Sequence, residues 1–176
     1  MLVSMSMSVQ IQWLPQSENN KAEIDKISLP IASTVLEIAV QGDVILGCRW
    51  QVKNGDLLIE NVVAEWQALL DYLKYPNQAL QVKLLQQGTQ FRHLVWQQLI
   101  KIPFAQTVSY GQLAREIHSS PRAVAAACRA NPYPGIIPCH RVVSSSGTGG
   151  FMGQSHGEFV ELKRQLLLFE HQQVNK

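Results

Sequence analysis

Residues 131–143 read Asn-Pro-Tyr-Pro-Gly-Ile-Ile-Pro-Cys-His-Arg-Val-Val. The three prolines and the glycine rule out a continuous helix, because proline fixes φ and removes a backbone donor. The stretch is therefore expected to be a stiff segment that holds Cys139 at a fixed place. A thiol next to His140 and Arg141, which can both carry positive charge, is expected to ionise and act as a nucleophile.

Composition limits what the chain can be. It has 176 residues, of which 46% are hydrophobic and 16% are charged, and its formal net charge is +2. This length suits one large domain or two small ones, and the apolar content is enough for a sizeable core. So small a net charge gives no global nucleic-acid signature. A polyanion would have to bind through a local basic patch.

Cysteine usage and the start of the chain indicate the compartment. Cys48, Cys128 and Cys139 are too few and too irregularly spaced for a disulfide framework, and no CxxC pair indicates zinc. We therefore expect neither a metal site nor a cofactor. The start of the chain lacks a signal-peptide pattern, and no apolar run reaches the length of a membrane span. A soluble, cytoplasmic protein that does not bind membranes is the expectation.

The first half of the chain carries no evident chemistry. Its alternating apolar residues and turn signals predict short strands around one amphipathic helix. The strands are expected at residues 9–14, 34–40, 44–50 and 79–85, a loop at 15–25, a turn at 54–56 and the helix at 62–73. Residues 1–86 are thus predicted to form a small antiparallel sheet with one helix, which serves as a scaffold. Cys48 is expected to be packed there as a small hydrophobic side chain.

From residue 87 onward the apolar pattern becomes helical. Helices are expected at residues 90–102, 111–117, 122–130 and 158–170. Thr89 and Ser120 are the expected N-caps, with Pro121 in a first turn. The face predicted to point inward on the first of these helices consists of Phe91, Leu94, Val95, Leu99 and Ile102.

The second and third of these helices are joined by a short connection. This arrangement predicts a helix-turn-helix, although an ordinary helical hairpin fits the pattern equally well. After the cysteine, a loop of small residues at 144–150 is able to wrap a ligand closely with its backbone.

Cys139 needs partners if its sulfur is to react, because a thiol is a weak nucleophile and a thiolate is a strong one. In extended backbone the side chain of His140 cannot easily reach its neighbour, so a bridging water is the more natural geometry. An acid that orients the histidine has to come from elsewhere in the chain. Judged on these residues alone, a buried structural cysteine is the alternative.

Pro138-Cys139-His140-Arg141-Val142 resembles the active-site signature of the methylated-DNA–protein-cysteine methyltransferases, also called 6-O-methylguanine-DNA methyltransferases. Further segments follow in that family's order: Phe91 with Val95-Trp96, Ile102-Pro103, and residues 109–114, 122–124 and 131–132. The resemblance is close over residues 87–170 and loose before them. It implies an α/β (α+β) fold, with a ribonuclease H-like domain at residues 1–86. Residues 87–176 would form a mainly helical, winged-helix or helix-turn-helix-like domain for DNA binding and alkyl transfer.

The resemblance also implies a single-turnover reaction at Cys139. This residue would take the alkyl group from the oxygen at position 6 of guanine and remain alkylated. His140 would deprotonate it through a water, Glu170 would orient His140, and Asn131 would hold the turn before the cysteine. Arg141 is then expected to be a structural partner and not an activator.

The implied partner is double-stranded DNA that carries 6-O-alkylguanine, with 4-O-alkylthymine as a further candidate lesion. The damaged base has to leave the stack to reach a fixed sulfur, and Arg122 would fill the gap. The implied DNA-contacting residues are Tyr110, Arg122, Ala123, Ala126 and Arg129. The implied pocket residues are Val142, Phe151, Met152 and Lys163. The protein is expected to act as a monomer.

Some features depart from the family's pattern. The connection between residues 114 and 122 is shorter than usual, and an alternative alignment would put alanine at the intercalating position. Phe151 and Met152 stand where tyrosine and serine are common, so the pocket is expected to be less polar. The segment at 153–158 is longer than usual, which bears on the placement of Lys163 and Glu170. The zinc ligands known in some members have no counterpart in the first half of this chain.

Two other functions fit parts of the sequence. A non-catalytic relative that binds alkylated DNA would lack the acceptor Cys139. A helix-turn-helix regulator with a structural cysteine would not need His140, Glu170 and Tyr110 together.

Overall fold

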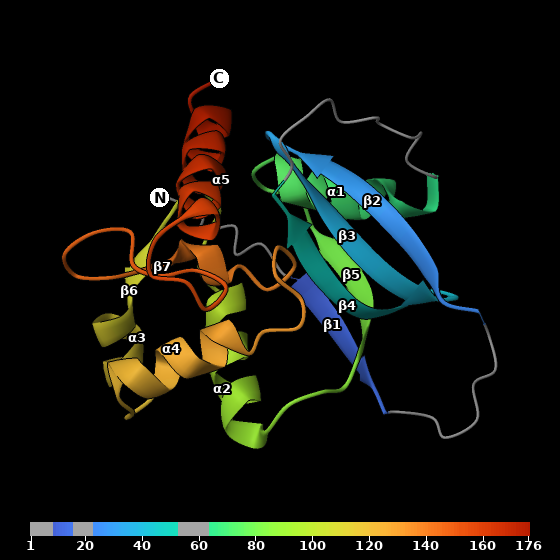
Figure 1. Cartoon of the computed structure of the whole chain (residues 1–176). Helices are drawn as coiled ribbons and strands as arrows, with labels where there is room; N and C mark the ends of the chain where they lie inside the picture. Colours follow the sequence, from blue (N-terminus) through green and yellow to red (C-terminus); the bar gives the residue numbers. More distant parts are fainter. Residues whose placement is uncertain (1–8, 16–22, 53–63) are drawn as a thin grey trace, which may run out of the picture.

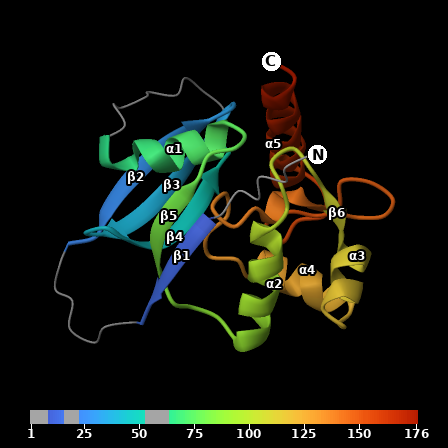
Figure 2. The ribbon, with the colours of Figure 1, turned by 180° about the vertical axis from the view of Figure 1, so that it is seen from behind.

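The computed structural model describes residues 9–15, 23–52 and 64–176. A sheet with helix α1 makes up one half of the molecule, and a group of helices makes up the other (Figure 1). Seen from behind, α1 lies across one face of the sheet (Figure 2). The predicted α/β (α+β) class is confirmed.

The sheet has the strand order β1-β5-β4-β3-β2. Its strands are β1 (Val9–Leu14), β2 (Asp25–Ile31), β3 (Thr34–Gln41), β4 (Val44–Gln51) and β5 (Leu80–Leu85). The expected strands are confirmed, with ends that shift by at most one residue. β2 was not predicted. It contains Pro30, which weakens a strand pattern, and it lies at the edge of the sheet, where proline is tolerated.

The predicted antiparallel sheet is wrong in one respect. β2, β3 and β4 pair in antiparallel fashion, but β5 is parallel to both β1 and β4. The reason lies between β4 and β5, where the chain passes through α1. A helical crossover brings the next strand back in the same direction, as parallel pairing requires. The sheet is therefore mixed.

Helix α1 (Gln67–Lys74) covers the sheet and follows a 3₁₀ turn, η1 (Ala64–Trp66). It buries a stripe of side chains, namely Leu69, Leu70, Tyr72 and Leu73. The expected helix began at residue 62. Residues 62 and 63, the turn expected at 54–56 and most of the loop expected at 15–25 lie outside the described residues.

The second half contains α2 (Gln90–Ile100), α3 (Tyr110–Glu116), α4 (Pro121–Arg129) and α5 (Glu158–Val174). A side-chain hydroxyl caps each of the first three. Thr89 accepts from the Arg92 N–H, Ser109 from that of Gln112, and Ser120 from that of Ala123. The predicted caps at Thr89 and Ser120 are confirmed. A cap of this kind satisfies a backbone donor that the first turn leaves unpaired.

The predicted inward face of α2 is partly wrong. Phe91 and Leu94 are 38% and 41% exposed, whereas Val95, Trp96 and Leu99 are buried. The helix is turned so that the Trp96 indole N–H donates to the Ala127 carbonyl on α4, at 2.9 Å. Because a buried indole N–H needs an acceptor, this bond fixes which face of α2 packs inward.

Helices α3 and α4 form the expected helix-turn-helix. His118 has a φ of 53°, and the Ser119 N–H donates to the Ala114 carbonyl at 2.8 Å. These features reverse the chain within a few residues. The short connection seen in the sequence therefore gives a tight turn that leaves both helices intact.

The segment that precedes Cys139 contains no continuous helix, as predicted. Cys139 itself opens a 3₁₀ turn, η2 (Cys139–Arg141), because the Arg141 N–H donates back to the Pro138 carbonyl at 3.0 Å. The extended backbone assumed around Cys139 and His140 is therefore wrong. After η2, the strand β7 (Val142–Val143) pairs in parallel with β6 (Val108–Ser109).

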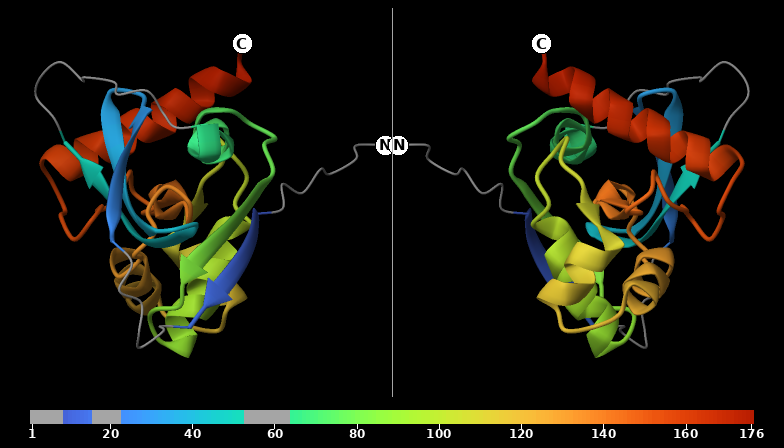
Figure 3. Two further views of the ribbon diagram at one scale, coloured as in Figure 1. Left: turned by 90° about the vertical axis from the view of Figure 1, so that its right-hand side faces the viewer. Right: turned by 90° about the vertical axis from the view of Figure 1, so that its left-hand side faces the viewer.

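The same segment joins the two halves. The Cys48 N–H of β4 donates to the Pro132 carbonyl at 2.8 Å. Gly135 approaches Leu36, Leu73 and Trp50 closely, and one hydrophobic cluster contains buried residues of both halves. The side views show α5 running past the sheet as well as the shorter helices (Figure 3). Cys139 is thus mounted on a segment that packs against a rigid sheet.

Among the described residues, no helix has the length and apolar character needed to cross a lipid bilayer.

Candidate active site

Cys139 lies at a pocket of about 330 Å³ between α4 and the segment 150–155. The sulfur-bearing side chain is only 3% exposed. Tyr110, Phe151 and Met152 supply large side chains to the wall of the pocket. A cavity of this volume can hold a small ligand, and a nucleophilic sulfur lies in its wall.

The Cys139 thiol is not activated by its sequence neighbours in the way the sequence suggested. Burial raises the pKa of this thiol, while a hydrogen bond with Asn131 and the charge of Lys163 act in the opposite direction without outweighing it. His140 and Arg141 both turn to Glu170 instead. Burial therefore works against the ready ionisation expected of this thiol, because it disfavours the charged form.

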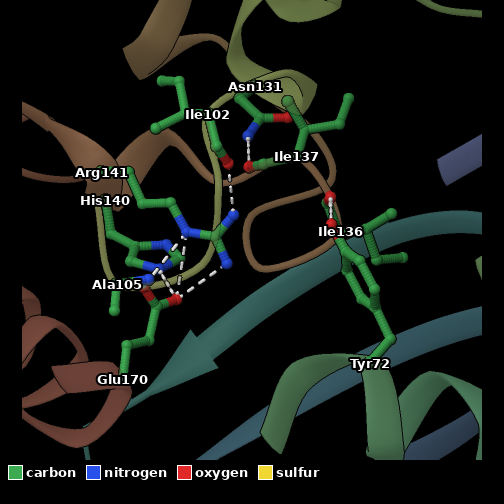
Figure 4. A network of polar contacts seen from close by, with 9 residues as sticks. All are labelled: Tyr72, Ile102, Ala105, Asn131, Ile136, Ile137, His140, Arg141 and Glu170. Atoms are coloured by element: carbon green, nitrogen blue, oxygen red, sulfur yellow. Dashed lines mark hydrogen bonds and ion pairs between the residues drawn. The ribbon is translucent and has the colours of Figure 1, made fainter. Parts of the chain in front are cut away.

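His140 and Arg141, which follow the cysteine in the chain, belong to a buried network of charged groups (Figure 4). His140 Nε2 is 2.7 Å from Glu170 Oε1. The Arg141 Nε and Nη2 atoms donate to the same carboxylate at 3.0–3.2 Å, and Arg141 Nη1 donates to the Ile102 carbonyl at 2.8 Å. The Ala105 N–H donates to Glu170 Oε2 at 3.0 Å. Arg141 is thus a structural partner of Glu170.

This network keeps Glu170 ionised. Burial by itself would raise the pKa of Glu170, but the charge and hydrogen bond of His140 outweigh it. Arg141 adds to their effect, and together they hold that pKa at about 2. The anionic Glu170 accepts a hydrogen bond from His140 Nε2–H, so the proton of the ring is held on Nε2. Nδ1 is then the basic nitrogen, and this buried atom has no hydrogen-bond partner among the described residues.

Asn131 holds the turn that leads to the cysteine. Its Nδ2 donates to the Ile137 carbonyl at 2.8 Å, and its Oδ1 accepts from the Tyr133 N–H at 2.9 Å. Both bonds are buried, so the side chain replaces backbone partners that the prolines cannot supply. Asn131 therefore sets the position of Cys139 relative to the end of α4.

Lys163 reaches the site from α5 and is fully buried. Its Nζ donates to the Val142 carbonyl at 2.6 Å and to the Gly150 carbonyl at 3.1 Å. It also lies 5.7 Å from the centre of the Tyr110 ring. Burial lowers the pKa of Lys163 to about 8, while Cys139 and Cys128 oppose that shift. Lys163 ties the loop after the cysteine to the last helix.

The other expected site residues fall into two groups. Arg122, Ala126 and Arg129 on α4 are exposed, and all three line the pocket together with Phe151 and Met152. Ala123 lies on α4, and Val142 is buried; neither lines the pocket. The carbonyl of Cys139 accepts from the Val142 N–H, and the carbonyl of Val142 accepts from Lys163.

Sequence reasoning gave Cys128 no role in the site and included Gly150 only within a loop of small residues. Cys128 lines the pocket as Cys139 does. Gly150 also lines it, and its carbonyl accepts from Tyr110 Oη at 3.4 Å. The glycine-rich composition of the loop gave a signal for Gly150. Helical spacing from Ala125 to Cys128 gave one for Cys128, since residues three apart share a face.

The described residues hold no group of three or more His, Cys, Asp or Glu side chains placed to bind a metal ion.

Comparison with known proteins places this site in a family. Residues 90–172 match the family model described as 6-O-methylguanine DNA methyltransferase, DNA binding domain. This match spans just under half of the chain, and the matched region is similar to that family. The resemblance of the Pro-Cys-His-Arg segment is thereby confirmed, and the helix-turn-helix and the pocket both lie in the matched region.

Curated relatives include a methyltransferase and a bifunctional DNA repair enzyme. A methylated-DNA–protein-cysteine methyltransferase of Methanocaldococcus vulcanius is 41% identical over 86 residues, which are 49% of this chain and 49% of that protein. The bifunctional transcriptional activator/DNA repair enzyme Ada of Escherichia coli is 46% identical over 95 residues, 53% of this chain and 26% of Ada. Each match covers about half of this chain. It spans about half of the Methanocaldococcus protein and about a quarter of Ada.

Solved structures extend the likeness to the first half. An O6-methylguanine methyltransferase of Mycobacterium tuberculosis superposes with a TM-score of 0.62 and 26% identity, over 86% of this chain and 94% of that one. A structure of the M. tuberculosis protein in complex with DNA gives 0.61 and 28%, over 84% and 93%. The fold of the family therefore covers both the sheet and the helices of this chain.

Proposed function

We propose that this protein repairs double-stranded DNA by moving the alkyl group of 6-O-alkylguanine irreversibly onto Cys139. One observation carries the proposal. The pocket that contains Cys139 is also lined by Arg122, Ala126 and Arg129 of α4, the second helix of a helix-turn-helix in a DNA-binding family. A nucleophile and a DNA-facing helix thus meet at one opening. The same site is a candidate for 4-O-alkylthymine.

The alkylated nucleotide would have to leave the base stack, because a buried sulfur cannot reach into a duplex. The pocket of about 330 Å³ has the dimensions of a site for a flipped base. Arg122, exposed at the first turn of α4, would occupy the gap in the duplex. Ala123 and Ala126 keep this helix thin, so that its N-terminal end can approach the phosphates. Tyr110, in the wall of the pocket, would contact the flipped nucleotide.

The transfer itself needs a thiolate at the moment of reaction. His140 Nδ1, left basic by the Nε2 contact with Glu170, would take the Cys139 proton through a bridging water. The sulfur would then attack the alkyl carbon. A carbon–sulfur bond forms, the carbon–oxygen bond to guanine breaks, and the electron pair of that bond stays on the base, which takes up a proton. The thioether that remains on Cys139 has no proton to lose, so each molecule would react once.

Intact mass spectrometry tests the proposal directly. The full chain is incubated with a duplex oligonucleotide that carries one 6-O-methylguanine. We expect the protein to gain one methyl group, mapped to Cys139 by peptide analysis, with no further gain when DNA is in excess. Cys139→Ala should gain none, and Cys48→Ala should react like the original chain. Binding of the DNA without any gain in mass would contradict the proposal.

The role of α4 is tested by comparing two substrates. Arg122→Ala should slow the reaction with duplex DNA by at least about tenfold, which corresponds to about 1.4 kcal/mol of lost transition-state binding. It should leave the reaction with free 6-O-benzylguanine nearly unchanged, since no stack has to be opened. Arg115→Ala, at an exposed arginine of α3 outside the pocket, is the matched control. Equal losses on both substrates would contradict the proposed role of Arg122.

A further inference from the structure

Two thiols share the proposed acceptor pocket. Cys128, in the last turn of α4, and Cys139, at the start of η2, both line it. Both are free and buried, at 7% and 3% exposure. The remaining cysteine, Cys48, lies on β4 and does not line this pocket. The alkyl transfer proposed above uses one sulfur and gives the second no task.

One residue holds the backbones of both cysteines. The Asn131 N–H donates to the Cys128 carbonyl at 3.2 Å, while Asn131 Nδ2 donates to the Ile137 carbonyl at 2.8 Å. That same Ile137 carbonyl accepts from the Cys139 N–H at 2.8 Å. The end of α4 and the start of η2 are therefore hydrogen-bonded to a single residue, the first through its backbone and the second through its side chain, and their relative position is fixed.

The surroundings of the two sulfurs also overlap. Burial lowers the pKa of Lys163, and both thiols act to raise it. Both therefore lie within electrostatic reach of one amine. The pocket between them is open to small molecules and is lined by Tyr110 and Gly150 on its other side. A peroxide of a few atoms can enter such a space.

We propose that Cys128 and Cys139 form a redox pair, in which hydrogen peroxide converts them into a disulfide that covers the acceptor sulfur reversibly. The Cys139 thiolate attacks one peroxide oxygen, a sulfur–oxygen bond forms and the oxygen–oxygen bond breaks. The departing hydroxide takes up a thiol proton and leaves as water. The Cys128 sulfur then attacks the sulfur of Cys139, the sulfur–oxygen bond breaks, and a second water leaves. Two thiols lose two electrons and two protons, and one peroxide becomes two waters.

This chemistry gives the second thiol a use. Without Cys128, the sulfenic acid on Cys139 has no thiol beside it and is oxidised further to sulfinic acid, which thiol reductants do not reverse. With Cys128 present, oxidation stops at a disulfide that a small thiol can reduce. Because burial raises the pKa of both thiols, the oxidation should be slow at neutral pH and faster at higher pH.

The test needs no DNA, so its outcome is independent of the proposed repair activity. The full chain is treated with a small excess of hydrogen peroxide, free thiols are blocked, and the intact mass and the peptides are measured without reduction. We expect a loss of two hydrogen masses, a Cys128–Cys139 linked peptide, and one blocked thiol at Cys48. Dithiothreitol should restore both thiols. Phenylarsine oxide, which bridges two nearby thiols, should form one adduct that consumes Cys128 and Cys139 together.

Substitutions separate the pair from general oxidation. Cys48→Ser should still form the disulfide. Cys128→Ala and Cys128→Ser should instead gain oxygen atoms on Cys139. In each variant, dithiothreitol should restore less than about a tenth of the free Cys139 thiol that was present before oxidation. Sulfinic acid on Cys139 in the original chain, with no linked peptide before unfolding, would overturn the proposal. So would a disulfide that always contains Cys48.

Discussion

The two halves of the molecule differ in what they bury. Among the described residues, the buried polar or charged side chains of the helical half are Asn131, His140, Arg141, Lys163 and Glu170, whereas the sheet half buries only Thr34. An apolar core tolerates exchange among residues of similar volume. A buried hydrogen-bonded charge network requires its particular partners. The family match at residues 90–172 lies within the half that buries the charges, whereas the likeness in fold extends over 84–86% of the chain.

The largest effect is expected where the buried charges are unbalanced. Glu170→Gln leaves Arg141 buried without its carboxylate, and removal of one partner from a buried pair costs about 4 kcal/mol of unfolding free energy. His140 also loses the group that fixes its tautomer, so alkyl transfer should slow as well. Urea denaturation and single-turnover kinetics measure the two effects.

The control for this change lies on the same helix. Glu161→Gln alters an exposed pair with Arg164, which should change the unfolding free energy by less than about 0.5 kcal/mol and leave the reaction unaffected. If both variants behaved alike, burial of the charge network would not be what makes the helical half sensitive to substitution.

Acid should also lower the stability of the protein, because it protonates Glu170. The pKa of Glu170 is about 2 in the folded protein, against an ordinary value of 4.5. Because the folded value is the lower one, the ionised carboxylate contributes its full stability above pH 4.5 and loses it as the pH falls toward 2. The contribution is about 3 kcal/mol. Denaturation midpoints between pH 6 and pH 2.5 should fall in the original chain. In Glu170→Gln they should fall less, and parallel curves would contradict this assignment.

In the sheet half, a large loss of stability should leave the chemistry intact. Ile45→Ala removes a fully buried side chain from β4 and should cost about 3 kcal/mol. The rate of alkyl transfer per folded molecule should stay the same, because Ile45 lies on a strand of the sheet and does not line the pocket. A lower rate at a temperature where circular dichroism still shows a folded protein would contradict this separation of stability from chemistry.

The same contrast marks how far the sequence could predict the structure. Local features were predictable: Ser120 and Thr89 as caps and the absence of a helix before Cys139 depend on near neighbours. The direction of β5 and the buried face of α2 depend on distant partners. Trp96 points inward because of Ala127, and no pattern within α2 contains that information. The meeting of Glu170 with His140 was expected only through the resemblance, since thirty residues of chain separate them.

The junction between the halves offers a smaller effect with an internal control. Gly135 has a φ of +95°, and a Cβ there would lie 3.0 Å from Leu36 and 3.3 Å from Leu73 and Trp50. Gly135→Ala should cost about 2 kcal/mol from the unfavourable φ and the crowding. It should also slow alkyl transfer, since the segment that carries Cys139 has to shift.

Gly42→Ala provides the comparison. Its φ is +59°, and a Cβ there would meet nothing within 4 Å. We expect about 1 kcal/mol from backbone strain alone and an unchanged rate of transfer. Equal losses in stability and rate for the two variants would show that close packing at the junction does not connect the sheet to the site.

The smallest effect concerns the start of α4. Ser120→Ala removes the cap that accepts from the Ala123 N–H, which should cost about 1 kcal/mol and fray the turn that carries Arg122. Thr89→Ala removes the equivalent cap of α2, with a similar loss of stability. Since only the first change loosens a helix proposed to meet DNA, it alone should slow the reaction with duplex DNA relative to free 6-O-benzylguanine. A similar selective slowing in Thr89→Ala would mean that global stability, and not the order of α4, governs access to the damaged base.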